Sequence, residues 1–190
     1  MTWTSATLWR PDFTDADLTG ANFTSATLTT ATATGTNLTG ANLKSTTLTG
    51  LSAVGATLDG ASLIQTSLTG AAMNRASMVG VTGRHSDLSD TILSSADLTE
   101  ANLAWSNFDN ANARGAKLTN ATITDSSFSR TKLEGTDLTG ANLTGSKMGN
   151  VSLWNANLTG ADVSYTDMTA ANLWGTILTD TNLTGAVLTD

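Results

Sequence analysis

The apolar residues of this chain recur with a period of five along its whole length. Counted from Met1, the sequence divides into 38 pentads without remainder. The third position of the pentad holds 23 of the 24 leucines, all four phenylalanines and every methionine except Met1. The first position is Ala in 20 pentads and Thr in nine, the fourth is Thr or Ser in 23, and the fifth is Gly in 15. An internal repeat of this regularity restricts the possible folds more than any other property of the sequence.

Neither common secondary structure places residues five apart on one face. In an α-helix five residues turn about 500°, so successive apolar residues would be displaced by roughly 140° and would spiral round the axis. In a flat strand side chains alternate with a period of two, so residues five apart point to opposite sides. Both conflicts disappear if the chain turns a corner once per pentad, because the first and third positions can then face a common axis. The period therefore predicts a solenoid, with Thr at the fourth position adding β propensity and Gly at the fifth allowing a positive φ at the corner.

The repeated motif is Ala, then Asp or Asn, then Leu or Phe, then two variable residues, as at 41–43, 96–98 and 141–143. In this motif the whole chain resembles the pentapeptide-repeat family. The resemblance implies an all-β fold, a right-handed four-sided β-helix with four pentads in each coil. Residues 1–190 would then form a single domain of about nine and a half coils, roughly 45 Å long. Pairs that lie four pentads apart fit such stacking: Phe108 and Phe128, Met148 and Met168, Trp154 and Trp174, Arg114 and Glu134.

Composition argues against several classes of protein. Without cysteine there is neither a disulfide framework nor a thiolate metal site, and one histidine with dispersed carboxylates predicts no metal and no cofactor. The net charge of −7 argues against direct binding to nucleic acid or to an anionic membrane. The sequence has no basic and apolar leader and no run of 18 apolar residues, so we expect a cytoplasmic protein without a signal peptide or a membrane span.

His85 is the only histidine and lies in the least regular pentad, where Gly83 takes the core position. A general base needs a nucleophile and an orienting carboxylate within hydrogen-bond reach. On the coils before and after it, the neighbours of His85 would be Gln65 and Trp105, which supply neither. We therefore expect no catalytic residue and no enzyme, and we interpret His85 as a solvated corner residue beside a local kink or bulge at Gly83.

With four pentads per coil each pentad belongs to one of four sides, and the acidic residues concentrate on one of them. This acidic face, formed by residues 16–20 and every fourth pentad thereafter, sums to a charge of −5, whereas the other sides sum to −2, zero and zero. Its charged residues are Asp17, Asp59, Asp97, Glu100, Asp137 and Asp180, with Lys117 as the single base. We predict that these six acidic residues bind a partner.

Some members of the pentapeptide-repeat family resemble B-form DNA in shape and charge, bind DNA gyrase and protect it from quinolones or peptide toxins. The resemblance implies a protein-binding module with gyrase or a related topoisomerase as its partner. Duplex DNA carries one charge per ~1.7 Å, or about 26 over the length of this rod, so the acidic face would be a dilute mimic. The alternative is a scaffold for an unknown partner, in which the carboxylates serve only solubility.

Trp154 and Trp174 occupy the outward fourth position on adjacent coils of one side and form what we call the aromatic strip. Such a strip predicts either a partner or self-association site, or two rings that only cover each other. Trp3 and Trp9 are expected to close the N-terminal end of the core. We predict a homodimer through the C-terminal coil, formed either end to end or along the aromatic strip.

Ice binding is a remote alternative suggested by paired outward hydroxyls. Three successive coils of one side present such pairs, namely Thr27 and Thr29, Thr47 and Thr49, and Ser67 and Thr69. Further along, Asp87, Asp109 and Lys147 interrupt the same side, which argues against an ice-binding array.

Overall fold

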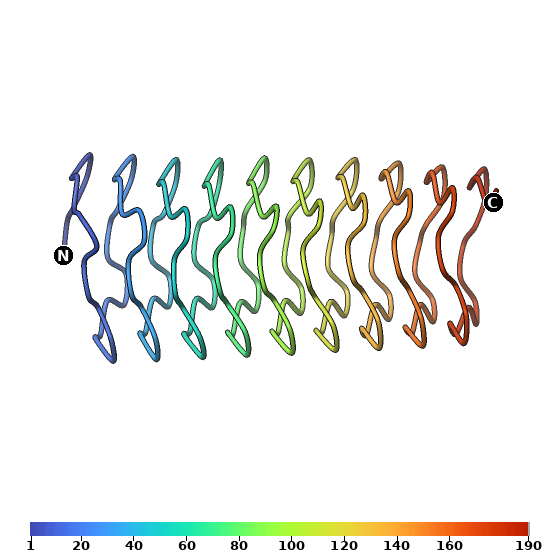
Figure 1. The fold of residues 1–190 in the computed structure, drawn as a ribbon, viewed down its shortest axis with the longest axis horizontal. Helices are drawn as coiled ribbons and strands as arrows, with labels where there is room; N and C mark the ends of the chain where they lie inside the picture. Colours follow the sequence, from blue (N-terminus) through green and yellow to red (C-terminus); the bar gives the residue numbers. More distant parts are fainter. Residues whose placement is uncertain (190) are drawn as a thin grey trace.

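The chain winds into one straight rod of stacked coils, with its two ends at opposite ends of the rod (Figure 1). The computed structural model describes residues 1–189. Each second-position residue pairs in parallel with the second-position residue four pentads later, from Thr2 with Asn22 to Asp167 with Val187. Four pentads therefore complete one turn of the solenoid, which confirms the coil length that the family resemblance implies.

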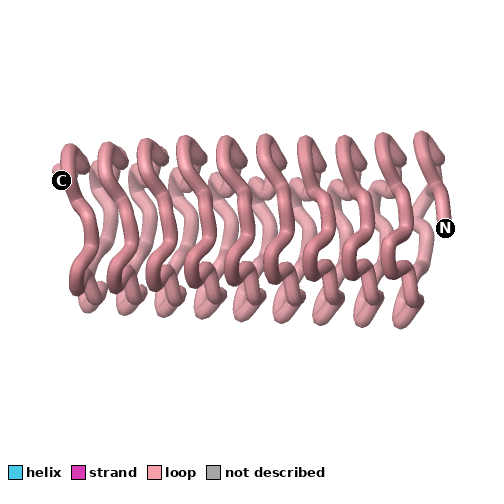
Figure 2. The backbone as a smooth tube through the Cα atoms, turned by 180° about the vertical axis from the view of Figure 1, so that it is seen from behind, coloured by secondary structure: helices cyan, strands magenta, loops and turns pink. Residues whose placement is uncertain are grey.

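Residues 1–189 form neither a helix nor a continuous strand (Figure 2). The elements are single-residue β-bridges at the second position of each pentad, and most pentads have a turn at the fourth and fifth positions. A corner in every pentad leaves room for one bridged residue per side. Each side of the rod is consequently a ladder of single bridges, one per coil, in place of extended strands.

The backbone amides of four of the five pentad positions find backbone partners. Amides at the second, third and fifth positions donate to carbonyls of neighbouring coils, and the first-position amide closes the turn onto the preceding third-position carbonyl. At residues 42–46 the bonds are Asn42 N to Ala21 O at 2.8 Å, Leu43 N to Ser62 O at 2.8 Å, Ser45 N to Ile64 O at 2.9 Å and Thr46 N to Leu43 O at 3.1 Å. The fourth-position amide is left over.

In many pentads with Asn or Asp at the second position, that side chain accepts this remaining amide. Thr24 donates its backbone N–H to Asn22 Oδ1 at 3.0 Å and its hydroxyl to the same atom at 2.6 Å. Thr139 makes the same two bonds to Asp137, at 3.1 and 2.6 Å. The pattern explains why Asn or Asp recurs at the second position and Thr at the fourth, since buried or half-buried backbone donors need partners.

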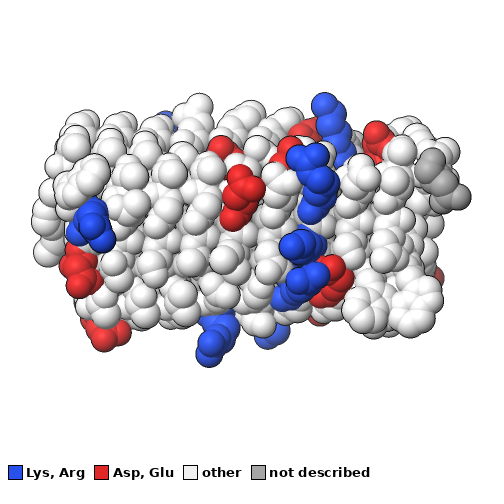
Figure 3. All heavy atoms as spheres, viewed as in Figure 1, with Lys and Arg blue, Asp and Glu red and all other residues white. Residues whose placement is uncertain are grey.

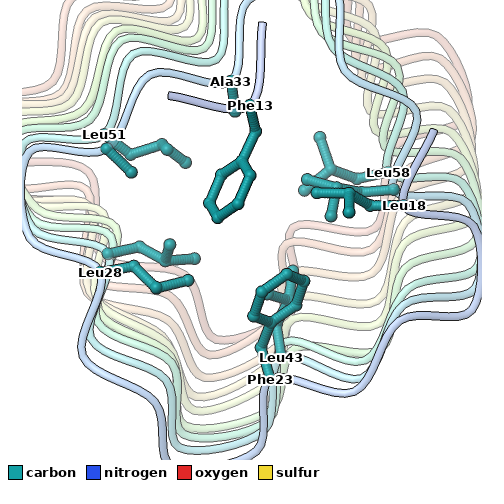
Figure 4. A pocket seen from close by; sticks show the side chains of 11 residues that line it. Phe13, Leu18, Phe23, Leu28, Ala33, Leu43, Leu51 and Leu58 are labelled. Atoms are coloured by element: carbon teal, nitrogen blue, oxygen red, sulfur yellow. The ribbon is translucent and has the colours of Figure 1, made fainter. Parts of the chain in front are cut away.

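The first and third positions form the core, as the period predicts. Leu98 and Leu143 are completely buried, and the rings of Phe108 and Phe128 stack in parallel with their centroids 4.8 Å apart. Figure 4 shows side chains from all four sides meeting on the axis near the N-terminal end, with Phe13 directed into the interior. The void between them is apolar and only about 20 Å³, so the core is closely packed.

The expected kink or bulge at Gly83 is wrong. Thr82 pairs with the second-position residues of both neighbouring coils, so the ladder continues without interruption. A Cβ atom on Gly83 would lie 2.6 Å from Leu103 Cδ2 and 3.2 Å from Leu63 Cβ. The leucines above and below thus fill the space that the missing side chain leaves, and the backbone need not bend.

The expectation for the N-terminal tryptophans is confirmed for Trp3 and wrong for Trp9. Trp3 packs on Phe13 and Phe23 with centroid distances of 6.4 and 6.2 Å. Trp9 is 84% exposed. The difference follows from the pentad, because Trp3 occupies the inward third position and Trp9 the outward fourth.

Every fifth-position residue from Ser5 to Gly185 has a positive φ, between 47° and 70°. This left-handed conformation reverses the chain direction at the corner and is free of steric cost only for glycine. Many corners nevertheless carry other residues, including the β-branched Thr30 with φ of 55°. Such corners hold local strain that the surrounding ladder sustains.

Thr30→Gly should therefore raise the free energy of unfolding by about 1 kcal/mol, since it relieves a β-branched side chain at positive φ. Thr29→Gly is the matched control, because Thr29 is the adjacent residue at the fourth position, where φ is not positive. It should lower stability by up to about 1 kcal/mol. Urea unfolding followed by circular dichroism measures both variants, and an equal loss in the two would contradict the assigned strain.

A second prediction concerns Asp137, whose pKa is lowered by its hydrogen bonds from Thr139, with a further contribution from the charge of Lys117. A carboxylate with a lowered folded-state pKa stabilises the fold above its unfolded value of about 3.9, and this contribution is lost as pH falls through the folded-state pKa. Asp137→Asn keeps the Oδ1 acceptor but does not titrate. The stability difference between the native chain and the variant should be constant from pH 7 to about 5 and shift in favour of the variant below about pH 4. A difference that stays unchanged in urea unfolding at pH 3 would contradict the account.

Candidate functional site

The six predicted residues of the acidic face lie on one side of the rod, as a widely spaced row. Asp17, Asp97 and Asp137 share the second-position column of that side. The other three are Asp59 at the fourth position, and Glu100 and Asp180 at the fifth. All six fall on alternate coils, about 10 Å apart along the axis. The structure therefore aligns these residues without bringing them together into a cluster.

Neighbouring groups reduce the field at the centre of the acidic face. Lys117 pairs in the ladder with both Asp97 and Asp137, and its Nζ lies 3.5 Å from Asp97 Oδ2. Burial opposes ionisation of Asp97, but the hydrogen bonds from Thr99 and the charge of Lys117 outweigh it and lower the pKa of this carboxyl. The pKa of Asp17 is also lowered, by its hydrogen bonds from Thr19. These carboxylates are charged at neutral pH.

The aromatic strip is only partly covered by its own rings. The Trp154 and Trp174 centroids lie 5.8 Å apart with the planes inclined by 40°, and the two residues are 45% and 68% exposed. The same column continues towards the N-terminus with Glu134 and Arg114, which form a bidentate ion pair at 2.9 to 3.0 Å. Figure 3 shows Lys and Arg gathered in the C-terminal half of this view. The strip thus adjoins a charged surface and leaves much of Trp174 in solvent.

Of the hydroxyls considered for ice binding, those of Thr49, Ser67 and Thr69 bond to their own chain. Thr49 Oγ1 lies 3.4 Å from Ser67 Oγ, and Thr69 donates its hydroxyl to Asp87 Oδ2 at 2.9 Å. This side is a hydrogen-bonded ladder that an acidic residue terminates, and it gives ice binding no support.

An open groove of about 610 Å³ runs along one corner of the rod and was not predicted from the sequence. It follows the corner where the pentad of residues 81–85 meets that of residues 86–90, and it crosses the next three coils. The fifth-position column lines one edge with His85, Trp105, Asp125 and Gly145. The second-position column lines the other with Asp87, Asn107, Ser127 and Lys147, and Ser86, Ser106 and Ser126 lie between the two columns.

A ladder of buried serines underlies this groove. Ser106 donates its amide to Ser126 Oγ at 3.0 Å, and Ser126 donates its amide to Ser146 Oγ at 3.2 Å. At Ser106 and Ser126 these bonds replace the usual turn bond from the first-position amide to the preceding third-position carbonyl. Ser86 and Ser146 keep that turn bond, at 3.3 and 3.1 Å. The sequence carries the signal, because Ser86, Ser106, Ser126 and Ser146 recur in every fourth pentad at a position that is usually Ala.

His85 lies at one end of the groove and stacks on Trp105, with centroids 5.3 Å apart and planes within 16°. Arg84 Cζ lies 4.4 Å from the centroid of the same indole. The hydroxyl of Ser86 donates to the Leu63 carbonyl, so it is not paired with the imidazole as a nucleophile would be. Trp105 is thus confirmed as a neighbour of His85. The imidazole is a corner side chain that stacks on this indole.

Residues 1–189 contain neither a metal-binding cluster nor a membrane-spanning helix. No three His, Asp or Glu side chains of this part of the chain gather in a group that could hold a metal ion. In the same residues no helix has the length and apolar character needed to cross a membrane.

The similarity to a known protein family extends over nearly the whole repeat region of the chain. The family described as "Pentapeptide repeats (8 copies)" matches residues 12–50, 52–82, 84–112, 96–135, 136–175 and 166–190. No curated protein sequence matches the chain.

Several solved structures share the fold. HetL from the cyanobacterium Nostoc sp. strain PCC 7120, a pentapeptide repeat protein involved in heterocyst differentiation regulation, is 25% identical with a TM-score of 0.57, covering 100% of this chain and 90% of HetL. QnrB1, a plasmid-mediated fluoroquinolone resistance protein, is 17% identical with a TM-score of 0.73, covering 96% of this chain and 86% of QnrB1. A pentapeptide repeat protein from the thylakoid lumen of Arabidopsis thaliana is 34% identical with a TM-score of 0.50, covering 51% of this chain and 68% of its own. With its repeats matched along nearly the whole sequence, the chain belongs to the pentapeptide repeat family and folds as a right-handed, four-sided β-helix.

Proposed function

We propose that this chain is a non-enzymatic protein-binding rod whose acidic face takes the place of DNA phosphates on DNA gyrase or a related topoisomerase. The observation that carries the proposal is the row of carboxylates on alternate coils of one side. A basic surface that binds duplex DNA recognises a line of negative charge. The straight row of carboxylates on this narrow rod presents such a line. The fold likeness to a fluoroquinolone resistance protein makes gyrase the first partner to test.

The spacing of the charges sets the expected strength. One carboxylate per ~10 Å is several times sparser than the one charge per ~1.7 Å of duplex DNA. Lys117 reduces the field further by its ion pair with Asp97. Binding through this face should therefore be modest in affinity and should weaken steeply as ionic strength rises, because exposed charges are screened.

The test is a gyrase supercoiling assay with and without a fluoroquinolone, in which micromolar native protein should reduce the inhibition by the drug. The triple variant Asp97→Asn, Glu100→Gln and Asp137→Asn should lose most of this effect. Its amide side chains preserve the hydrogen-bond acceptors while removing the charges. No effect of the native protein at micromolar concentration would exclude gyrase and leave a scaffold for another partner as the function.

A matched control removes three carboxylates from other sides of the rod by Asp12→Asn, Asp15→Asn and Asp167→Asn. Net charge changes equally in the two triples, so this control should retain protection. If both triples lose protection to the same extent, the effect depends on net charge and the acidic face has no special role.

We also propose that two rods associate along the aromatic strip. Trp174 is 68% exposed on the flank of the rod, and Trp154 beside it extends the apolar surface to a second coil. Large aromatic side chains exposed on the surface of a protein often mark an interface, because association removes their apolar surface from water. A two-fold arrangement would place the strip of one copy against that of the other.

Sedimentation equilibrium at tens of micromolar protein checks this association. The native chain should form dimers, and Trp154→Ser with Trp174→Ser should shift the equilibrium to monomers. Trp9→Ser is the control, since Trp9 is also an exposed fourth-position tryptophan but lies in another column. A native chain that sediments as a monomer over this range would contradict the proposed interface.

A further inference from the structure

Two opposite charges in the corner groove have no side-chain partner among residues 1–189. Asp125 makes no side-chain hydrogen bond or ion pair, and its Oδ1 lies over Gly145, only 2.8 Å from where a Cβ atom of that residue would be. Lys147 across the groove is equally unpaired and does not reach Asp125 within ion-pair distance. Other carboxylates near the groove are engaged: Asp87 accepts from Thr69 and Ser89, and Asp109 accepts from Ser127 and Ser129.

An aromatic wall lies beside the free carboxylate. Trp105 is 42% exposed and precedes Asp125 in the fifth-position column, one coil away. Arg84 and His85 of the preceding coil already lie against this indole, the guanidinium 4.4 Å from its centroid, so a partner would contact the part of the ring that stays exposed. An indole next to an unpaired carboxylate suits arginine better than lysine, because a guanidinium both stacks on an aromatic surface and pairs with a carboxylate through two parallel bonds.

The shape of the groove favours an extended segment over a small molecule. Its lining residues come from four successive coils, which span about 14 Å at the β spacing and match about four residues of extended chain. The groove is open along its length, whereas sites for small ligands usually enclose most of the ligand surface. Single exposed ion pairs contribute little, so recognition here requires both charges and the indole together.

We propose that this corner groove binds an extended segment of a protein partner, with an arginine of the segment paired to Asp125 against Trp105 and a carboxylate of the segment paired to Lys147. The inference rests on the proposed protein-binding function but uses a different surface from the acidic face. The rod would then bind partners through two surfaces. The acidic face would bind a basic surface, and the corner groove would bind a short segment that contains an arginine and a carboxylate.

The probe is the peptide acetyl-Ala-Arg-Ala-Glu-Ala-amide, titrated into the full-length ¹⁵N-labelled chain and followed by amide and indole chemical shifts. Shifts should concentrate at the groove, including the indole N–H of Trp105. The same peptide with citrulline in place of arginine keeps the shape and removes the charge, and it should bind about tenfold more weakly. Equal binding of the two peptides would overturn the assignment of an arginine site. If free arginine bound as tightly as the peptide, the groove would be a small-molecule site, and the proposal that it binds an extended segment would be wrong.

The protein variants test the residues one at a time. Asp125→Asn should weaken peptide binding about threefold, and Lys147→Gln should reduce the preference for Glu over Gln in the peptide. The control for the first is Asp15→Asn, because Asp15 is also a fifth-position aspartate at positive φ with its Oδ1 close over a glycine, Gly35, yet it lies outside the groove.

Equal weakening by Asp125→Asn and Asp15→Asn would overturn the proposal. Trp105→Ala should also weaken peptide binding, whereas the control Trp9→Ala should bind the peptide as the native chain does. The urea midpoints of all variants show whether the fold is retained. No gyrase is present in this titration, so its failure is distinguishable from failure of the acidic face. The triple variant of the acidic face should bind the peptide as the native chain does.

Discussion

Every corner of this rod depends on a residue held at positive φ. That residue turns the chain after three extended positions, so the first and third side chains face the axis and the second, fourth and fifth face outward. Hydrogen bonds between coils and across the turns then satisfy all but one backbone amide of a typical pentad, and where the second position is Asn or Asp its side chain commonly accepts the last one. The side chains of the second and fourth positions therefore take part in these hydrogen bonds, whereas the fifth position contributes its backbone conformation. The fifth-position side chain has no part in that hydrogen-bond pattern, and this position carries Glu100, Trp105 and Asp125 despite its positive φ.

The sequence alone predicts the inside and outside of the rod, because a period of five requires a corner in each pentad. The period alone does not predict how many corners close one coil; the family resemblance implies four, and the pairing of Thr2 with Asn22 confirms this number. The expected bulge at Gly83 is absent, because Leu63 and Leu103 of the neighbouring coils fill the gap, which the pentad of Gly83 alone does not reveal. A coil of four pentads assigns every pentad to one side of the rod. It therefore also fixes the sides on which the acidic residues and the aromatic strip lie.

The groove could not be predicted from single pentads. A single Ser at the first position has no neighbour with which to form a ladder, whereas Ser at this position on successive coils lets each amide bond to the next hydroxyl. Asp125 and Lys147, which have no side-chain partner in the described part of the chain, line the groove beside this ladder. The acidic face lies on a different side, so a repeat whose core is nearly uniform carries two surfaces of different chemistry. Function in such a fold depends on which outward residues break the repeat.

The closure of each coil by four pentads is the claim on which the sides, the acidic face and the groove all rest. The most direct measurement is the pattern of nuclear Overhauser contacts in the ¹⁵N- and ¹³C-labelled chain. Long-range contacts should fall at sequence separations close to four pentads along the rod, as between Leu43 and Ser62, whose backbones are joined by a hydrogen bond of 2.8 Å. Contacts that instead cluster near separations of three or five pentads would mean a different number of corners per coil and would contradict the account.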